Sequence, residues 1–377
     1  LFSVVAGHAQ LSLDECRRLA RENYPEIRQY DLVHQTEQYN LSNAARAWIP
    51  QLAFSAQATW QTDAPNFPKE LTGMLAQQGL EIPGLRKDQY KVALELNQTI
   101  WDGGKSVADK RIARAEAAEQ KTMTDVDLYE LEGRVDDLYF GILLLDERIA
   151  QTNLTLNLLR SNLEKVRALQ RNGVAMQSDA DVLEAELLSV GQQLIQFESS
   201  CDSYRRMLGI FIGQKVGDRK LQHPSAVQPL SGESARPELA MFAAKIDRLT
   251  AQEKMVKSSS MPRLGFFAQG YYGYPGLDYM QSMMNNDWSW NAMLGVKLSW
   301  NFGAYYTQKN NLNKLPTSRQ QVEVQRDVFL FNMNLQAAQE NGDIARLRKA
   351  IADDDRIVAL RRSVRCLLYT SDAADEL

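Results

Sequence analysis

Side chains that commonly perform catalysis or bind metals are few in this 377-residue chain, and their spacing points to no reaction. The three histidines, His8, His34 and His223, lie far apart, and no cysteine pair has the spacing of a zinc site. Gly103-Gly104-Lys105 lacks the flanking glycines of a phosphate-binding loop, and the aspartates at 353–355 fit the solvated face of a helix. These patterns predict no catalytic residue, no metal site and no cofactor, so we expect a protein that is not an enzyme.

Two of the cysteines lie within helical patterns of apolar residues. We expect Cys16 and Cys201 to be packed thiols without a catalytic role. An oxidising compartment would permit them to pair, and the sequence leaves that alternative open.

The composition excludes several classes of protein. Hydrophobic residues make up 44% and charged residues 24%, with a formal net charge of -4, which excludes bulk disorder and a strongly basic nucleic-acid-binding protein. The mean hydropathy is -0.39 and no apolar stretch reaches about 18 residues, so a helical membrane protein is excluded as well. With 11 prolines and 21 glycines, the chain is typical of long helices.

An internal repeat organises the chain. Pro25 and Pro50 are 25 positions apart, and so are Pro237 and Pro262. The residues around them match as well, because each first proline begins Pro-Glu-Ile or Pro-Glu-Leu and each second proline lies in Ile/Met-Pro-x-Leu-x-Phe. Two later segments also match: Thr99–Gly104 and Leu298–Gly303. These matches occur in the same order and indicate a duplication, in which each half is predicted to be helix, strand, loop, strand, helix.

Two strands are predicted in each half, because apolar and polar residues alternate there with a period of two. Each has roughly ten residues, enough for a tilted strand to cross a bilayer, and aromatic residues lie near the strand ends. The apolar side chains, which we expect to face lipid, are Leu52, Phe54, Trp60, Tyr90, Val92, Leu94, Leu96, Leu264, Phe266, Leu294, Val296, Leu298 and Trp300. The polar side chains, which we expect to face a lumen, are Gln57, Lys91, Glu95, Asn97, Lys297 and Asn301.

A soluble sheet covering a core would show the same alternation. The membrane is favoured because the loops at about 63–88 and 274–289 are long and rich in Asn, Gln, Pro, Gly and Met, and because the flanking helices are too long for a small sheet. Four strands cannot close a barrel, and an open edge in lipid would leave backbone groups unpaired. Two chains would enclose a lumen filled by side chains, whereas three would leave a conduit, so we expect a trimer.

A long helical hairpin is predicted after the first pair of strands. No proline interrupts 105–170, and apolar residues there follow a sustained heptad pattern that returns over 183–211. Between the two segments, Gly173 can end the first helix in a left-handed conformation. We predict that Ser178 and Asp181 form a capping box at the start of the second helix.

Together these features resemble the TolC-like outer membrane efflux protein family over about residues 11–365. The resemblance is carried by the duplicated halves, the I/M-P-x-L-x-F and W-[DN]-x-G motifs around the strands, and the G-x-x-x-x-S-D-x-D-x-L-x-A turn at Gly173–Ala185. It implies a mainly α protein with membrane β structure, in which a long α-helical coiled-coil barrel joins four transmembrane β-strands per protomer. Three protomers would form a 12-stranded barrel in the outer membrane of a Gram-negative bacterium, above a periplasmic helical domain.

The resemblance also implies a function, that of a passive outer-membrane duct in a tripartite efflux or type I secretion system that exports drugs, metals or other solutes. Its partners would be a periplasmic adaptor, an inner-membrane RND or ABC-type transporter, and outer-membrane lipid, with no nucleic acid. The residues expected to dock the adaptor are Arg171, Gly173, Val174, Ser178, Asp179, Asp181 and Leu183. A periplasmic adaptor is the alternative function, although two homologous halves with such long strands argue against it. Neither the substrate nor the class of pump is specified by these residues.

The two ends of the chain differ in composition from the rest, and the residues from Cys366 onward break the helical pattern before them. The expected divisions are a signal-peptide remnant at 1–9, a first repeat at 10–235, a second repeat at 236–365 and an artefactual tail, resembling a translated sequencing adaptor, at 366–377. In the first repeat, Trp101 and Gly173 are 72 positions apart. The same spacing from Trp300, the matching tryptophan of the second repeat, would place a second turn glycine near position 372. We therefore expect that the second repeat is truncated and that the intact gene product is longer.

Overall fold

The computed structural model describes residues 10–79, 82–224 and 236–375, with side chains described as far as residue 365. The expected signal-peptide remnant at 1–9 therefore lies outside the described residues, as do residues 225–235 before the second repeat. The chain divides into two units, Leu1–Lys309 and Asn310–Leu377.

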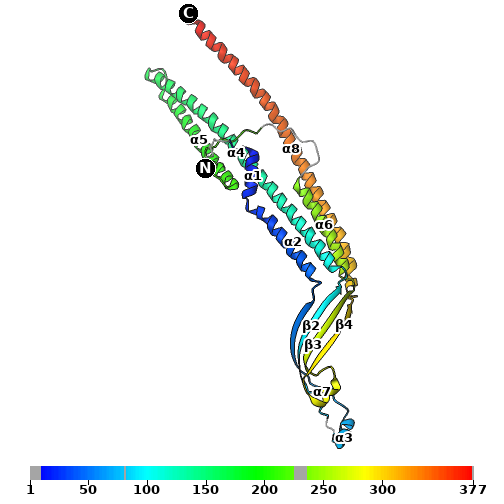
Figure 1. The fold of residues 1–377 in the computed structure, drawn as a ribbon. Helices are drawn as coiled ribbons and strands as arrows, with labels where there is room; N and C mark the ends of the chain where they lie inside the picture. The colour runs from blue at the N-terminus through cyan, green and yellow to red at the C-terminus, as the bar shows by residue number, and fades with distance from the viewer. Residues whose placement is uncertain (1–9, 80–81, 225–235, 376–377) are drawn as a thin grey trace, which may run out of the picture. The chain divides into compact units, whose positions relative to one another are not determined.

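The first unit contains both pairs of strands and most of the helices (Figure 1). Its helices are α1 (Leu13–Asn23), the 3-10 helix η1 (Pro25–Arg28), α2 (Gln29–Arg46), α3 (Lys69–Gln77), α4 (Lys105–Arg171), α5 (Gln177–Ile212), α6 (Pro237–Ser258), α7 (Tyr279–Asn285) and the start of α8 (Ala304–Asp375). Its strands are β1 (Gln51–Trp60), β2 (Asp88–Trp101), β3 (Arg263–Tyr274) and β4 (Ser289–Ser299). The predicted order of helix, strand, loop, strand, helix is confirmed in both halves. The short helices α3 and α7 lie in the two loops, where the sequence pattern predicted none.

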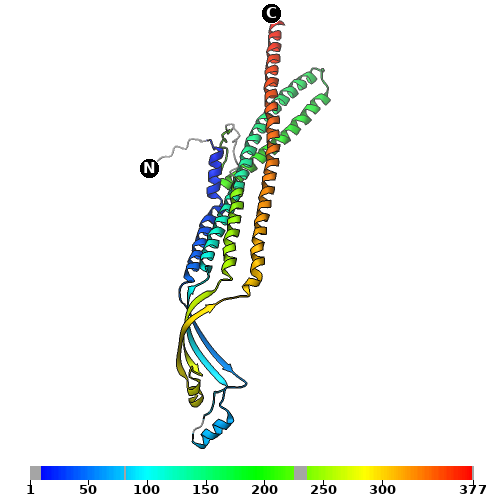
Figure 2. The ribbon, with the colours of Figure 1, turned by 90° about the vertical axis from the view of Figure 1, so that its right-hand side faces the viewer.

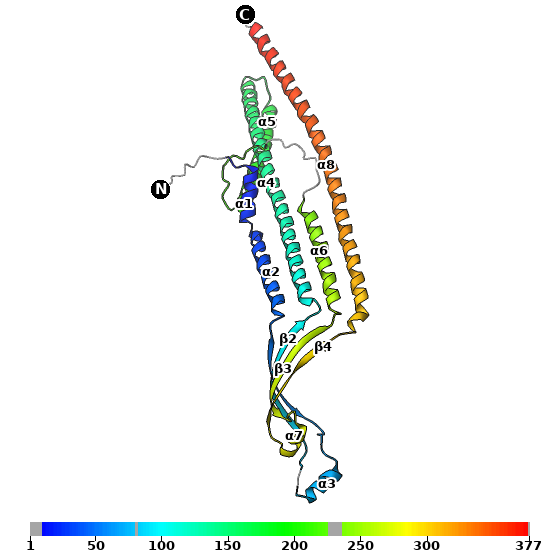
Figure 3. The same cartoon turned by 45° about the vertical axis from the view of Figure 1, so that its right-hand side comes forward.

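Helix α4 is the element on which α1, α2, α5 and α6 pack. It contacts α1, α2, α5 and α6, and Figures 2 and 3 show α2, α4 and α6 side by side and leading into the strands. With 67 residues at about 1.5 Å per residue, α4 is about 100 Å long. The predicted seam is confirmed, since Leu128, Leu131 and Val135 are buried along it. Thr152 interrupts the apolar pattern but is buried too. Its hydroxyl donates to the Arg148 carbonyl at 2.7 Å, so the buried polar group is hydrogen-bonded.

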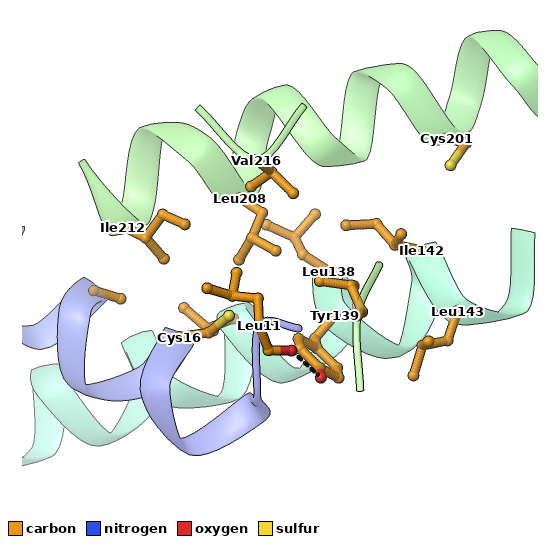
Figure 4. Close-up of a cluster of buried hydrophobic side chains, with 13 residues drawn as sticks. Leu11, Cys16, Leu138, Tyr139, Ile142, Leu143, Cys201, Leu208, Ile212 and Val216 are labelled. Carbon is orange, nitrogen blue, oxygen red and sulfur yellow. Dashed lines mark hydrogen bonds between the residues drawn. The ribbon is translucent and has the colours of Figure 1, made fainter. Parts of the chain in front are cut away.

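A hydrophobic cluster joins α1, α4, α5 and the segment after α5 (Figure 4). Its buried members are Leu11, Cys16, Ala20, Val135, Leu138, Tyr139, Ile142, Leu143, Cys201, Leu208, Ile212, Val216 and Leu221. Within it, the Tyr139 hydroxyl lies 2.8 Å from the Leu11 carbonyl and 2.6 Å from the Gln222 carbonyl. Leu11 and Leu221 also form a parallel β-bridge. Cys16 and Cys201 are both buried and free, so they do not form the disulfide that the sequence left open.

The four strands form one antiparallel sheet in the order β1-β2-β3-β4. Its register pairs apolar residues with apolar ones, such as Leu52 with Leu96 and Phe266 with Val296. The strands have 10, 14, 12 and 11 residues, so three are close to the predicted length of about ten and β2 is longer. One irregularity lies at the end of β2, where Trp101 pairs with Leu264 and Ile100 is the extra residue of a bulge.

The second unit is the remainder of α8, a helix of 72 residues. We expected the helical pattern to break at Cys366, but the helix continues to Asp375. Among the described residues, no helix has the length and apolar character required to cross a membrane.

Candidate functional site

One face of the sheet carries apolar side chains that are largely exposed. The exposed fraction is 72% for Phe54, 74% for Leu294 and 82% for Trp290. In the paired register, the even-numbered residues of β1, β3 and β4, and of β2 before its bulge, all lie on this face, which we call the apolar face. An exposed apolar surface of this extent marks a site that contacts lipid or another protein.

Aromatic rings gather at both ends of the strands on this face. At the end near α7, the Trp288 ring lies 5.6 Å from the ring of Tyr90 and 5.4 Å from that of Tyr272. At the other end, the Trp300 and Phe302 rings lie 4.7 Å apart. Two aromatic rows on either side of an aliphatic band are the arrangement found at membrane interfaces.

The opposite face of the sheet, which we call the polar face, carries the odd-numbered residues. Lys91 donates to Gln269 at 3.2 Å and lies over the Tyr271 ring, 4.5 Å from its centroid. Gln269 in turn donates from its Nε2 to the Glu95 carboxylate. This network joins β2 and β3 and combines a cation, an amide and an anion. Sequence periodicity assigned Lys91 and Glu95 to this face but missed Gln269, which links them.

Two predicted site residues lie beyond the end of β4. Trp300 donates from its indole N–H to the Ser260 carbonyl at 3.0 Å. The side chain of Asn301 accepts from the Gly303 N–H at 3.1 Å, in the turn that leads into α8. Asp102 occupies the matching position in the first half and accepts from the Gly104 N–H at 2.9 Å. The W-[DN]-x-G motif thus contains a side-chain acceptor that shapes the passage from strand to helix.

A second group of predicted residues lies at the turn between α4 and α5. Gly173 has a φ of 76° and ends α4, which confirms the predicted left-handed residue, and Val174 is 74% exposed. The predicted capping box of Ser178 and Asp181 is wrong, because α5 begins at Gln177 and Ser178 lies inside it.

The start of α5 is held by Asp179 instead. Its carboxylate accepts from the backbone N–H of Met176, the N-cap residue, at 3.0 Å. Asp181 accepts from the side chain of Gln177 at 2.7 Å. Of the two aspartates, Asp179 therefore shapes the turn. The sequence did not reveal this role of Asp179, because methionine is not among the usual N-cap residues.

The loops that follow β1 and β3 are joined at a single tyrosine. Tyr274 is 2% exposed, and its hydroxyl accepts from the Arg86 N–H at 2.9 Å and donates to the Asn286 side chain at 2.5 Å. Ala64 and Leu85 pack against the same ring. No local pattern in the sequence signals this contact, because its partners come from both halves of the chain.

Metal chemistry finds no support in the described part of the chain. No group of three or more His, Cys, Asp or Glu side chains there could hold a metal ion. What the described surfaces offer is a two-faced sheet and an exposed helical turn.

Comparison with known proteins decides the family. The model of the outer membrane efflux protein family matches residues 17–213, which is more than half of the chain. The chain belongs to this family. As an outer membrane efflux protein it is a channel of the outer membrane, and the alternative of a periplasmic adaptor is not supported. The family is one of channels and is not known for enzymatic activity.

Solved structures of similar fold agree with this membership. The outer membrane protein VceC from Vibrio cholerae is 15% identical with a TM-score of 0.60, and the match covers 85% of this chain and 75% of that chain. The outer-membrane channel OprN is 14% identical with a TM-score of 0.61, covering 84% and 71%. The Campylobacter jejuni CmeC outer membrane channel is 15% identical with a TM-score of 0.58, covering 85% and 68%. A search of the curated proteins finds no match. At this identity the structures establish the fold, a mostly helical chain with a small β-sheet.

Proposed function

We propose that this outer membrane efflux protein is a passive trimeric duct, with the apolar face of its sheet in lipid and the polar face around a conduit. The observation that carries the proposal is the two-faced sheet. Its apolar face exposes residues such as Leu294 and Trp290, while its polar face holds the Lys91, Gln269 and Glu95 network. Burial of one leucine side chain is worth about 1.5–3 kcal/mol, so a whole face of this kind is stable in lipid and unstable in water.

The edges of the sheet support association of several copies. β1 and β4 each pair with a strand on one side only, so the other edge of each carries unpaired backbone N–H and C=O groups. In hydrocarbon each unpaired group costs several kcal/mol. Pairing of β4 with β1 of the next copy removes that cost, and three copies of the 4-stranded sheet supply twelve strands. Three is our proposal because the smaller barrel formed by two copies would be filled by side chains.

The exposed turn between α4 and α5 supports a docking role. The residues that we propose to contact a periplasmic adaptor are Arg171 at the end of α4, Val174 in the turn and Leu183 within α5, with the backbone of the turn set by Gly173 and Asp179. An inner-membrane pump would deliver solutes through that adaptor. The duct needs no catalytic group. A polar, water-filled path lowers the energy barrier to crossing the membrane and leaves the solute chemically unchanged.

Neighbouring residues on opposite faces of β4 provide the test. Leu294→Arg puts a charge on the apolar face, and Met293→Arg puts the same charge on the polar face. An arginine facing lipid near the bilayer midplane costs about 2–4 kcal/mol, whereas one facing a wet lumen costs little. We expect Met293→Arg to retain, and Leu294→Arg to lose, a heat-sensitive trimer in outer membranes and the export of toxic compounds in a strain that lacks its outer channel.

Three results would contradict the proposal. One is equal tolerance of the two substitutions, which would place both faces in water. Another is a stably folded, water-soluble monomer of the unaltered chain. The third is a trimer that forms in the membrane but does not restore export, which would contradict the duct and leave the membrane sheet intact.

A further inference from the structure

The polar face carries three cationic side chains and one anionic side chain. They are Lys91, Glu95, Arg263 and Lys297. Lys91 and Glu95 are both bonded to the Gln269 side chain, so their opposite charges are joined through one amide. Arg263 and Lys297 are exposed and form no ion pair within the described part of the chain.

These two cations lie close to each other on adjacent strands. Arg263 pairs with Ser299, and Lys297 pairs with Gly265, so the cations occupy diagonal positions on the same face. Diagonal neighbours across two antiparallel strands are about 7–8 Å apart, within range for their charges to add.

The carboxylates near this pair are hydrogen-bonded to other groups and form no ion pair with Arg263 or Lys297 in the described part of the chain. Asp102 follows β2, but it is 8% exposed, and its two oxygens accept from the Gly104 N–H at 2.9 Å and the Ser106 N–H at 2.6 Å. Glu95 lies farther along the strand and is bonded to Gln269. The remaining neighbours on the face are Asn97, Thr99 and Ser299, which are uncharged. The end of the sheet next to the helices therefore exposes two cations, whereas the nearest carboxylate, that of Asp102, is buried in the turn after β2.

We propose that Arg263 and Lys297 select for anionic solutes where the conduit passes from the helices into the strands. This inference rests on the proposed duct, since each added copy would contribute the same pair to one ring. Rings of arginine and lysine favour anions because a low-dielectric wall focuses their field into the lumen. The class of solute is defined by its negative charge, such as that of a carboxylate or phosphate.

The experiment measures the reversal potential of the full chain in planar bilayers under a potassium chloride gradient. We expect chloride to permeate more readily than potassium. In the Arg263→Gln and Lys297→Gln double variant, the chloride-to-potassium permeability ratio should fall by about threefold or more, because the ring is expected to change the local potential by about one kT or more. The matched control is the double swap Arg263→Lys and Lys297→Arg, which keeps both charges and should keep the ratio.

The outcomes separate this inference from the duct itself. Conductance with an unchanged ratio in the glutamine variant, while the heat-sensitive trimer persists, overturns the anion selection and leaves the duct standing. A ratio that falls equally in the charge-conserving control also overturns it, since charge would then not be the cause. Trimers that conduct no ions contradict the duct and the selection together. A fall confined to the glutamine variant supports the proposal.

Discussion

The carboxylate of Asp179 accepts a hydrogen bond from the backbone N–H of Met176 at 3.0 Å, and this contact starts α5 at the turn of the hairpin. The first N–H groups of a helix have no partner within it, so an acidic side chain that reaches back stabilises the start. Gly173 ends α4 three residues earlier, with the Val174 N–H donating to the Leu169 carbonyl at 3.0 Å. The turn is therefore fixed from both sides.

Replacement of Asp179 by alanine should loosen the turn. Loss of such a cap costs about 1 kcal/mol, so amide hydrogen exchange at the first turn of α5 should become about five times faster. Asp181→Ala is the matched control, because Asp181 bonds only to a side chain of its own helix, and exchange there should change little. Equal exchange rates in the two variants would show that Asp179 does not hold the turn. If the turn docks an adaptor, Asp179→Ala should also weaken adaptor binding.

Removal of one hydroxyl should destabilise the helical core. Tyr139 is fully buried, and its hydroxyl lies within hydrogen-bonding distance of the Leu11 and Gln222 carbonyls. Tyr139→Phe leaves the Gln222 carbonyl without this donor, while the Leu11 carbonyl still accepts from the Gln222 N–H at 3.1 Å, and an unpaired buried carbonyl costs about 1–3 kcal/mol. Thermal unfolding in detergent, followed by circular dichroism, should show a lower midpoint. Tyr129→Phe, at a residue that is 41% exposed, should leave the midpoint unchanged, and an equal shift in both would contradict the assigned role.

Arg205 should hold the segment after α5 in place. Its guanidinium donates to the Asp146 carboxylate at 2.8 Å and to the Gly217 and Arg219 carbonyls at 3.0 Å each. Arg205→Ala should make this segment cleavable by added protease, at a cost to stability of about 1–3 kcal/mol for the groups left unpaired. Arg206→Ala is the control, because the Arg206 side chain is 74% exposed. A cleavage pattern shared by both variants would contradict the role of Arg205.

Stability should fall at high pH through Cys16. Burial, with a smaller effect of the Glu15 charge, raises the pKa of the Cys16 thiol from 9.0 to about 12. The neutral thiol is favoured in the folded state, so its contribution is complete below about pH 9 and is lost as the pH rises toward 12. In Cys16→Ala, the fall of the unfolding free energy across this range should be shallower by up to about 1.4 kcal/mol per pH unit. Identical pH profiles for the variant and the unaltered chain would contradict this assignment.

Much of the fold follows from patterns that are local in sequence. The strand faces were predictable because alternation in residues such as Leu52 and Phe54 is a direct consequence of strand geometry. The heptad seam of α4 was predictable for the same kind of reason, and even Thr152 lies on it. These features depend on the periodicity of apolar residues alone, which can be read from a single sequence.

Other features depend on contacts between distant residues or on small shifts of the backbone. The bulge at Ile100 places Trp101, the first residue of the W-D-G-G motif, opposite Leu264 and therefore on the apolar face. The alternation of apolar and polar residues in the sequence does not reveal this shift. Gln269 meets Glu95, and Tyr274 meets Arg86, only because β2 and β3 are neighbours in the sheet. The start of α5 was predicted wrongly because Ser178 and Asp181 fit a capping motif whose place is taken by Met176 and Asp179, two residues earlier.

A measurement of which residues of β4 face lipid and which face water tests the central claim most directly. Spin labels placed singly at 290–298, in a background without the native cysteines, report access to dissolved oxygen and to a water-soluble nickel complex in lipid bilayers. The proposed duct predicts that oxygen reaches the even positions, including Leu294, and that the nickel complex reaches the odd positions, including Met293. Access of the nickel complex to both sets of positions would contradict it.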